Sequence, residues 1–173
     1  TLLTPNNRLA RRLANEWNQR QLELGCAAWE TLQVAALERW LLDRWRQAVA
    51  MGLTDARCLL SPVQELQLWR KVIESSPQRG ERQSIINPDG ASEVARKART
   101  SLIDARVPLQ SQSIRQSFES DTDCAAFLQW NDRFEAELSS AGLCTAADCH
   151  IALHRVAADL PRTSVALVSF EDV

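Results

Sequence analysis

Glycine is scarce in this sequence, and its scarcity excludes two kinds of catalytic site. Only five glycines occur among 173 residues, and they are widely separated. A phosphate-binding loop needs the pattern Gly-x4-Gly-Lys-Ser/Thr, and the nucleophile elbow of many hydrolases needs Gly-x-Ser-x-Gly. Neither pattern occurs in the sequence. We therefore expect no ATP site of the phosphate-loop type and no elbow-type serine nucleophile in this chain.

Long apolar runs and an excess of one charge are also missing. No run approaches the roughly 20 apolar residues that a membrane-spanning helix needs, so we expect no membrane partner. The formal net charge is -2, with 20 basic and 22 acidic residues. The chain thus lacks the strongly basic character of proteins that coat nucleic acid by charge alone. Any contact with DNA must be local.

The cysteines indicate the cellular compartment, and the two ends of the chain indicate that it is part of a larger protein. The five cysteines are irregularly spaced, and no secretory leader precedes them. Such cysteines are typical of reduced thiols, so we expect a soluble, cytoplasmic protein. The chain opens at Thr1 without an initiator Met and stops at Val173, with a strand-like run beside each end. We interpret it as a piece of a larger protein without a complete active site of its own.

The spacing of apolar residues predicts a first helix that ends at about Leu24, before Gly25. Thr4 is the expected N-cap and Pro5 the first helical residue. Arg20 projects onto the apolar side and is interpreted as a snorkelling end residue. The residues expected to face inward are Leu9, Ala10, Leu13, Ala14, Trp17 and Leu24.

The rest of the chain is predicted to be mainly helical, joined by polar connections. A capping box at Ser61 and Gln64 opens one helix, and Thr145 with Asp148 caps the last, which is expected to run to about Leu160. Val94 is expected to face inward. The predicted helices span about 37–51, 61–73, 89–104, 121–140 and 145–160, and the predicted connections span 75–88 and 107–120.

Three strand-like runs complete the prediction of the fold. They lie at 1–3, at 32–35 and at 164–169, and the last is rich in β-branched residues, as buried parallel strands are. The sequence therefore predicts a mostly α-helical fold with a small parallel β-sheet. We expect a single domain over 1–173, with an α/β start at 1–50, a helical insertion at 51–160 and a returning strand at 161–173.

For each of three further groups of residues, a functional and a structural interpretation are possible. One group has the residue types that bind zinc: Cys144, Cys149, His150 and His154. Neighbouring residues of a helix point about 100° apart, so Cys149 and His150 would not face the same metal ion. The alternative is that the cysteines are core thiols and the histidines are half-exposed. Glu171 and Asp172 follow the last strand and would suit Mg²⁺, or form an exposed acidic turn. The tryptophans would stack on bases or pack in a core; Trp17, Trp45, Trp69 and Trp130 are expected in the core, and Trp29 is the one to inspect for exposure.

The turn between the first strand and the first helix is the strongest candidate for a binding site. Free amides at a helix start attract anions, Thr and Asn side chains donate to phosphate oxygens, and arginines add positive charge. The alternative is a capped helix with a solvated basic face. The predicted DNA-binding residues are Thr4, Asn6, Asn7, Arg8, Arg11 and Arg12.

The opening segment 2–13 (LLTPNNRLARRL) resembles the start of a bacterial family of DNA repair proteins that is similar to helicase-nucleases of the AddB and RecB type. The further landmarks of this resemblance, in order, are 29–31 (WET), 40–41 (WL), 59–62 (LLSP), Gln64, Glu65, Trp69, 86–88 (INP), Trp130 and 168–171 (VSFE).

The resemblance implies a superfamily 1 helicase-like α/β core fragment with an α-helical insertion. In working helicases of that kind, a strand followed by Thr-x-Asn contacts single-stranded DNA, and Thr4, Asn6 and Asn7 match that motif. The helicase half of the family lacks a working ATP site, and a PD-(D/E)XK nuclease domain, which would use Mg²⁺, lies elsewhere in the full protein. The implied function is a non-catalytic, DNA-binding module without a cofactor of its own, which contacts single-stranded or duplex-end DNA. The alternative is a scaffold that supports the nuclease domain or a partner helicase or nuclease subunit.

Overall fold

The computed structural model describes residues 1–76 and 87–170 as a mostly helical chain with small parallel sheets. The chain divides into two compact units. The first contains Thr1–Asp55 together with Ala152–Val173, and the second is Ala56–Ile151. The predicted helical insertion, 51–160, overlaps the second unit, and the prediction of a single domain stays a prediction.

The first unit is built on a three-stranded parallel sheet with the order β2-β1-β5. Its strands are β1 (Leu2–Thr4), β2 (Val34–Ala36) and β5 (Ala166–Leu167). Leu3 of the central strand is opposite Ala35 on one side and Leu167 on the other. Strand formation at all three predicted places is therefore confirmed, although the second and third strands are shorter than the predicted runs.

The last strand differs from the prediction in its burial. It pairs in parallel with β1, as expected, but both of its residues are exposed, and Leu167 is 65% exposed. The prediction of a buried strand was wrong because β-branched composition indicates strand formation and not whether another layer covers that strand.

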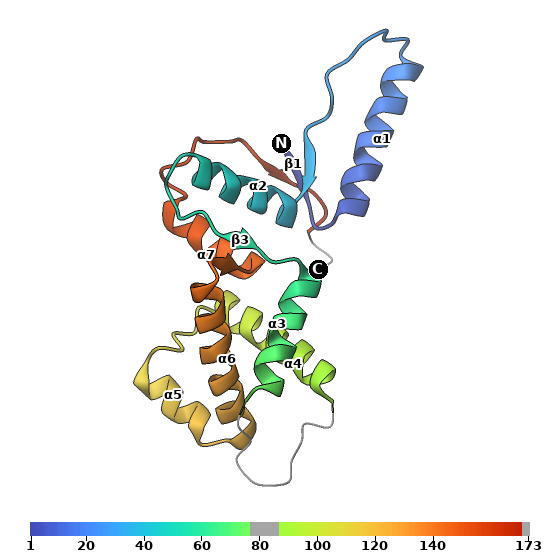
Figure 1. The fold of residues 1–173 in the computed structure, drawn as a ribbon. Helices are drawn as coiled ribbons and strands as arrows, with labels where there is room; N and C mark the ends of the chain where they lie inside the picture. Colours follow the sequence, from blue (N-terminus) through green and yellow to red (C-terminus); the bar gives the residue numbers. More distant parts are fainter. Residues whose placement is uncertain (77–86, 171–173) are drawn as a thin grey trace. The chain divides into compact units, whose positions relative to one another are not determined.

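Two helices accompany this sheet. Helix α1 (Asn7–Glu23) connects β1 to β2 and extends away from the sheet, and the chain after it runs back beside it to β2 (Figure 1). Helix α2 (Leu37–Ala50) follows β2 directly, and its buried residues are Trp45 and Ala48. Ala48 packs with Leu153 and Leu160 in a small apolar cluster.

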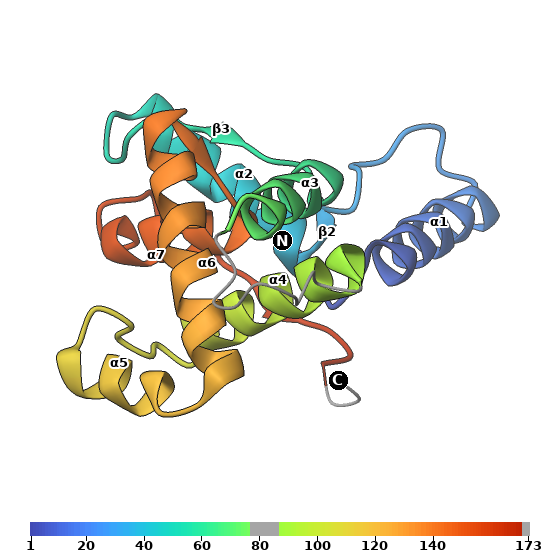
Figure 2. The same cartoon turned by 60° about the horizontal axis from the view of Figure 1, so that its bottom comes forward.

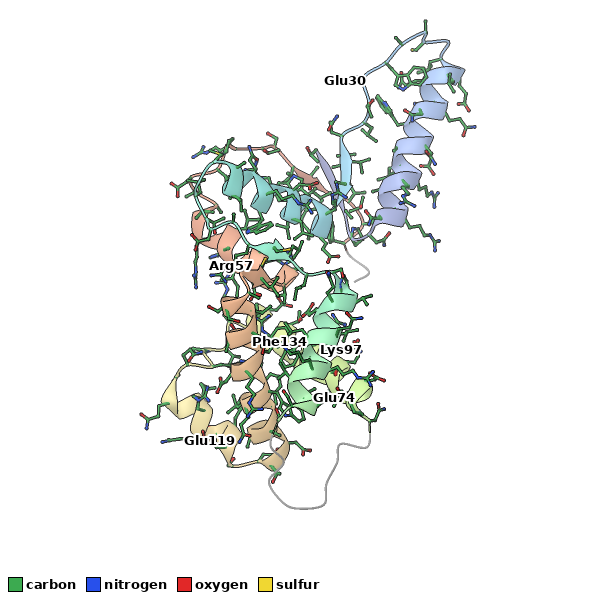
Figure 3. The ribbon with its side chains drawn as sticks, in the orientation of Figure 1. Glu30, Arg57, Glu74, Lys97, Glu119 and Phe134 are labelled. Atoms are coloured by element: carbon green, nitrogen blue, oxygen red, sulfur yellow. The ribbon has the colours of Figure 1, made fainter. Side chains whose placement is uncertain are left out.

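The second unit is mainly helical. It contains α3 (Pro62–Glu74), α4 (Pro88–Asp104), α5 (Gln112–Glu119) and α6 (Thr122–Ser140), and α5 lies against α6 (Figure 2). Trp69 and Phe134 form the centre of its core, with ring centroids 4.0 Å apart and both side chains fully buried. Figure 3 labels Phe134 on α6. The core positions predicted for Trp45 and Trp69 are confirmed, and Trp130 is half-buried against the same core.

Helix α7 (Ala146–Val156) begins in the second unit and continues into the first. It ends before the predicted end near Leu160. The prediction of a connection over 107–120 was wrong as well, because α5 occupies part of it; its Ser and Gln content hid the apolar residues Ile114 and Phe118, which are both half-buried. Val94 was predicted to face inward and is 68% exposed.

A second, two-stranded sheet in this unit was not predicted. Strands β3 (Cys58–Leu59) and β4 (Leu143–Cys144) pair in parallel, with Leu59 opposite Cys144. Each strand has only two residues, so neither has a recognisable alternation of apolar and polar positions. The pairing holds the start of the second unit to the segment that precedes α7.

The helix starts follow local capping signals. Ser61 and Gln64 form the predicted capping box, with hydrogen bonds in both directions. Thr145 and Asp148 bond reciprocally at the start of α7, since Thr145 N donates to Asp148 Oδ2 at 2.9 Å and Asp148 N donates to Thr145 Oγ1 at 3.3 Å. Asp121 caps α6 through its Oδ1, which accepts from two backbone amides. These three caps confirm the predicted starts of α3, α6 and α7. The first helix differs, because it begins at Asn7 and not at the predicted Pro5.

One arginine is buried in the second unit. Arg99 on α4 is only 3% exposed, and its guanidinium group donates to Glu135 Oε1 at 2.7 Å and to Asp148 Oδ1 at 2.6 Å. It also donates to Thr145 Oγ1 at 3.1 Å. This network ties α4, α6 and the start of α7 together.

Candidate nucleic-acid interface

Thr4 ends strand β1 and does not cap α1. Its side chain is 0% exposed, and its hydroxyl lies 2.9 Å from the carbonyl oxygen of Asn6 and 3.3 Å from that of Ala35. The hydroxyl proton is therefore used inside the protein. The N-cap of α1 is Asn6, so the predicted N-cap role of Thr4 was wrong. Thr4 instead fixes the turn after β1, and its buried hydroxyl is not placed to contact a phosphate.

Asn6 takes the N-cap position instead. Its backbone is extended, with φ -152° and ψ 161°, and its Oδ1 accepts a hydrogen bond from Leu9 N at 3.0 Å. Asn is among the best N-cap residues, so it competes successfully with Thr4 for this position. The cap uses only the side-chain oxygen. The residue as a whole is exposed.

The start of α1 keeps its positive character. No acidic residue lies in its first turn, and both Asn6 and Asn7 are exposed. The free N–H groups of a first helical turn and the helix dipole both favour an anion at this end. The polar environment predicted for this turn is thus present, with Asn6 and Asn7 at the surface and Thr4 beneath them.

The three predicted arginines of α1 differ in their partners. Arg8 and Arg11 are exposed, and neither forms an ion pair within the described residues. Arg12 Nε, in contrast, donates to Glu16 Oε1 at 2.7 Å, one helical turn further on. This hydrogen bond raises the pKa of Arg12 above its usual value. Arg8 and Arg11 can therefore offer their full charge to a ligand, whereas Arg12 is already partly neutralised.

Helical geometry places a further donor beside Arg8 and Arg11. Residues three, four and seven apart share one side of a helix, so Asn15 lies on the same side as these two arginines. Asn15 is exposed, and the prediction missed it; its spacing of four residues from Arg11 was the available signal. We call Asn7, Arg8, Arg11 and Asn15 the donor stripe. Arg8 and Asn15 are separated by about 10 Å along the helix axis at about 1.5 Å per residue.

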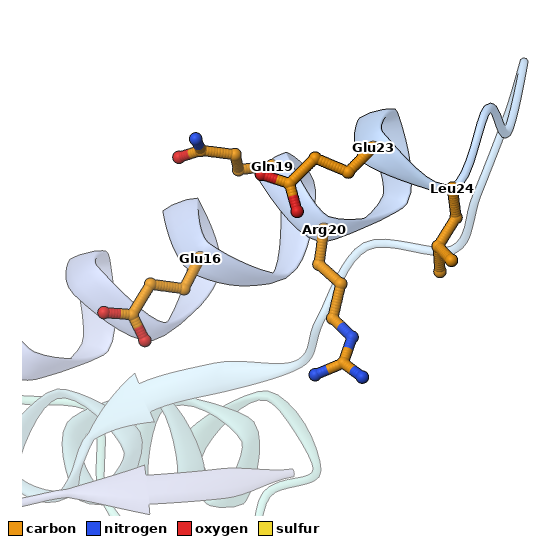
Figure 4. A pocket seen from close by; sticks show the side chains of 5 residues that line it. All are labelled: Glu16, Gln19, Arg20, Glu23 and Leu24. Atoms are coloured by element: carbon orange, nitrogen blue, oxygen red, sulfur yellow. The ribbon is translucent and has the colours of Figure 1, made fainter.

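The neighbouring side of α1 is acidic. Glu16 and Glu23 line a shallow hollow of about 460 Å³ together with Gln19, Arg20 and Leu24 (Figure 4). Two carboxylates repel a polyanion, so this hollow marks the border of the donor stripe. Arg20 was interpreted as snorkelling over an apolar side, and it is exposed at this hollow.

Two tryptophans fasten the chain segment after α1 to the helix. Trp17 Nε1 donates to the carbonyl of Glu30 at 3.1 Å, and Trp29 Nε1 donates to Asn18 Oδ1 at 3.0 Å. Trp17 is 37% exposed, so the prediction that it lies in the core was wrong; its side of α1 faces this segment and no further layer. Trp29, which was singled out for possible exposure, is half-buried. Both indoles act here as structural anchors.

The possible metal ligands do not form a site. Within residues 1–76 and 87–170, no three His, Cys, Asp or Glu side chains are grouped so that they could hold a metal ion. Cys144 and Cys149 are buried, which confirms the interpretation as core thiols, while His150 is half-buried and His154 exposed. Glu171 and Asp172, considered for Mg²⁺, lie outside the described residues.

No family model matches the chain, and no curated protein matches it. Among the helices that the structure describes, none combines the length and the apolar character that crossing a membrane requires.

Proposed function

We propose that this chain is a non-catalytic, helicase-like module of a DNA repair protein of the AddB and RecB type, and that its donor stripe binds the backbone of single-stranded DNA. The observation that carries this proposal is the pair Arg8 and Arg11, which are exposed on one side of α1 without an ion-pair partner in the described part of the chain. They follow directly after the anion-attracting start of the helix. A phosphate at that start would meet donors from Asn7 and Arg8.

The proposed contacts recognise charge and not sequence. Guanidinium groups bind phosphate oxygens in a bidentate manner, and amide side chains add hydrogen bonds to the same oxygens. Contacts of this kind to phosphate oxygens carry no sequence information of their own. We expect similar affinity for oligonucleotides of different composition.

The reaction of the whole protein would lie outside these residues. Under this proposal a PD-(D/E)XK nuclease domain of the parent protein cleaves DNA with Mg²⁺, and the present module supplies affinity for single strands or duplex ends. A partner helicase or nuclease subunit would provide movement along the strand. The chain itself takes no cofactor in this proposal.

Salt dependence is the first test of the proposal. Affinity of the chain for a fluorescent single-stranded oligonucleotide is measured by anisotropy between 50 and 200 mM salt. Two or three phosphate contacts predict a slope of log K against log salt of about -1.4 to -2.1, or roughly tenfold weaker binding over that range. Affinity that is independent of salt would overturn the proposal.

The second test uses neighbouring residues as matched variants. Arg11→Gln and Arg12→Gln remove the same charge from adjacent positions of one helix, but only Arg12 is paired with Glu16. We expect Arg11→Gln to weaken binding several-fold more than Arg12→Gln does. The variant Arg162→Gln changes an exposed arginine outside α1 by the same single charge and serves as a control for net charge. Equal losses in all three proteins would indicate unspecific attraction only.

One observation favours the scaffold as a second candidate function. Leu22 and Leu24, at the end of α1, are 64% and 68% exposed, and exposed apolar side chains close together are typical of protein contact surfaces. In that case the intact parent protein should bind DNA equally well after Arg8→Glu/Arg11→Glu. Leu22→Ser/Leu24→Ser should then weaken its association with the partner subunit.

A further inference from the structure

Two buried cysteines lie in contact where strand β4 leads into helix α7. The Sγ atoms of Cys144 and Cys149 are 3.7 Å apart, a distance at which one thiol donates a hydrogen bond to the other. The two residues are 3% and 1% exposed. No disulfide joins them. Neither thiol has a role in the proposed DNA contact.

The backbone between the two thiols is held in one conformation. The reciprocal hydrogen bonds of Thr145 and Asp148 fix the turn, and Cys149 N donates to the carbonyl of Thr145 at 3.1 Å. Cys144 is fixed on its other side, because its carbonyl accepts from Leu60 N at 2.9 Å. The fold therefore holds the backbone positions of the two cysteines, and with them the two side chains, close together.

The surroundings of Cys144 favour its thiolate. The hydrogen bond from Cys149 lowers the pKa of the Cys144 thiol below its usual value, although burial and the carboxylate of Asp148 act in the opposite direction. Arg57, which directly precedes β3, adds a favourable positive charge (Figure 3). The thiolate is the form of cysteine that reacts with disulfides.

We propose that Cys144 and Cys149 form a redox-active pair that closes to a reversible disulfide by exchange with a low-molecular-weight disulfide. The Cys144 thiolate bonds to one sulfur of the small disulfide, whose S–S bond breaks and whose other sulfur leaves as a thiolate. Cys149, as a thiolate, then attacks Sγ of Cys144 and expels the second small thiolate. The two cysteine protons end on the two released thiols, so the protein is oxidised by two electrons and the small disulfide is reduced.

The geometry makes the second step faster than its alternatives. The two sulfur atoms need to approach from 3.7 Å to about 2.05 Å, whereas a second small molecule would have to enter a buried site. Burial also predicts that the first step is slower than modification of Cys58, which is exposed. The new bond would join β4 to the first turns of α7, next to the Asp148 carboxylate that binds Arg99.

The test uses the full chain with the substitutions Cys26→Ser, Cys58→Ser and Cys124→Ser, so that only the proposed pair remains. The protein is incubated with glutathione disulfide and then analysed by mass spectrometry under denaturing, thiol-blocking conditions. The expected product has lost two hydrogen atoms, carries no glutathione and is fully restored by dithiothreitol. We also expect its melting temperature to rise on oxidation, because the link restricts the unfolded chain.

The single variants Cys144→Ser and Cys149→Ser, made in the same background, are the matched controls. Each should give at most one glutathione adduct and no rise in melting temperature. A chain that keeps both thiols after prolonged incubation, or that accumulates two glutathione adducts, would overturn the proposal. If the background variant does not fold, peptide mapping of the unmodified chain after the same treatment gives the same answer, since the Cys144–Cys149 cross-link is then either found or not.

Discussion

Arg12 Nε lies 2.7 Å from Glu16 Oε1, so one arginine on α1 is bound to a carboxylate while Arg8 and Arg11 on the same helix have no ion-pair partner in the described residues. Both members of the pair are exposed, with 73% and 57% of their side-chain surface accessible. An exposed pair of this kind contributes little to stability. Its main effect is on the electrostatic potential of α1, because Glu16 cancels one of three neighbouring positive charges.

Removal of Glu16 should therefore strengthen DNA binding. Glu16→Gln keeps the shape of the side chain and releases the charge of Arg12, and we expect affinity for single-stranded DNA to rise about two- to fivefold at low salt. The gain should disappear at high salt. Glu38→Gln, which removes an exposed carboxylate from the first turn of α2, is the control, and an equal gain in that variant would point to net charge alone.

Asn6 allows stability and binding to be separated. Asn6→Ala removes the cap of α1 and should cost about 1 kcal/mol of unfolding free energy, measured by urea denaturation. Asn6→Asp keeps a capping oxygen, so stability should be preserved, while the added negative charge should reduce DNA affinity. Asn7→Ala leaves the cap intact and is the control for stability. A stable Asn6→Asp variant with unchanged DNA affinity would argue against a phosphate at this helix start.

The buried Arg99 and the half-buried Arg115 should respond very differently to substitution. Arg99→Met removes a buried guanidinium and leaves the partly buried carboxylate of Asp148 without its partner, and we expect a loss of about 3 kcal/mol. Arg115 forms a fork with Asp132, with distances of 3.1 and 2.6 Å, at the surface of α5 and α6. Arg115→Gln should cost less than about 1 kcal/mol. Urea midpoints with unchanged slopes would report the two values.

Glu65 predicts a dependence of stability on pH. Burial raises the pKa of this carboxyl above its usual value, although the guanidinium groups of Arg96 and Arg99 act against the shift. The folded state thus holds the proton to higher pH than the unfolded state does, and stability falls as pH rises from the usual pKa through the raised one. Glu65→Gln should be more stable than the parent chain at neutral pH and no more stable near pH 4. Glu119→Gln, at an exposed position, should show no such crossover.

Local signals in the sequence were sufficient for three helix starts, but they misplaced the cap of α1 at Thr4 and were insufficient for burial. Ser61, Asp121 and Thr145 were predicted correctly because a cap depends on residues within one turn. Trp17, Leu24 and Val94 were predicted to face inward and are exposed, since periodicity shows which side of a helix is apolar and not whether another element covers it. The pairing of β3 with β4 joins segments far apart in the chain and has no local signal.

The candidate site was predicted in part for the same reason. Its position after the first strand followed from the sequence, and Asn6, Asn7, Arg8 and Arg11 are at the surface as expected. The burial of Thr4 depends on its contact with Ala35 in a neighbouring strand, which the local pattern does not contain. The pairing of Arg12 with Glu16 could have been read from their spacing of four residues.

The chain passes from one unit into the other at two places, and the local structure at these two places differs. The first lies in irregular backbone after Asp55, whereas the second falls between Ile151 and Ala152, inside the hydrogen-bonded body of α7. A protein trimmed to 56–151 would retain only the opening turns of that helix, and so short a helical remnant is marginal in water. Anyone who wishes to isolate the helical unit should therefore extend it to Val156, even though its last residues then lose the neighbours that normally cover them.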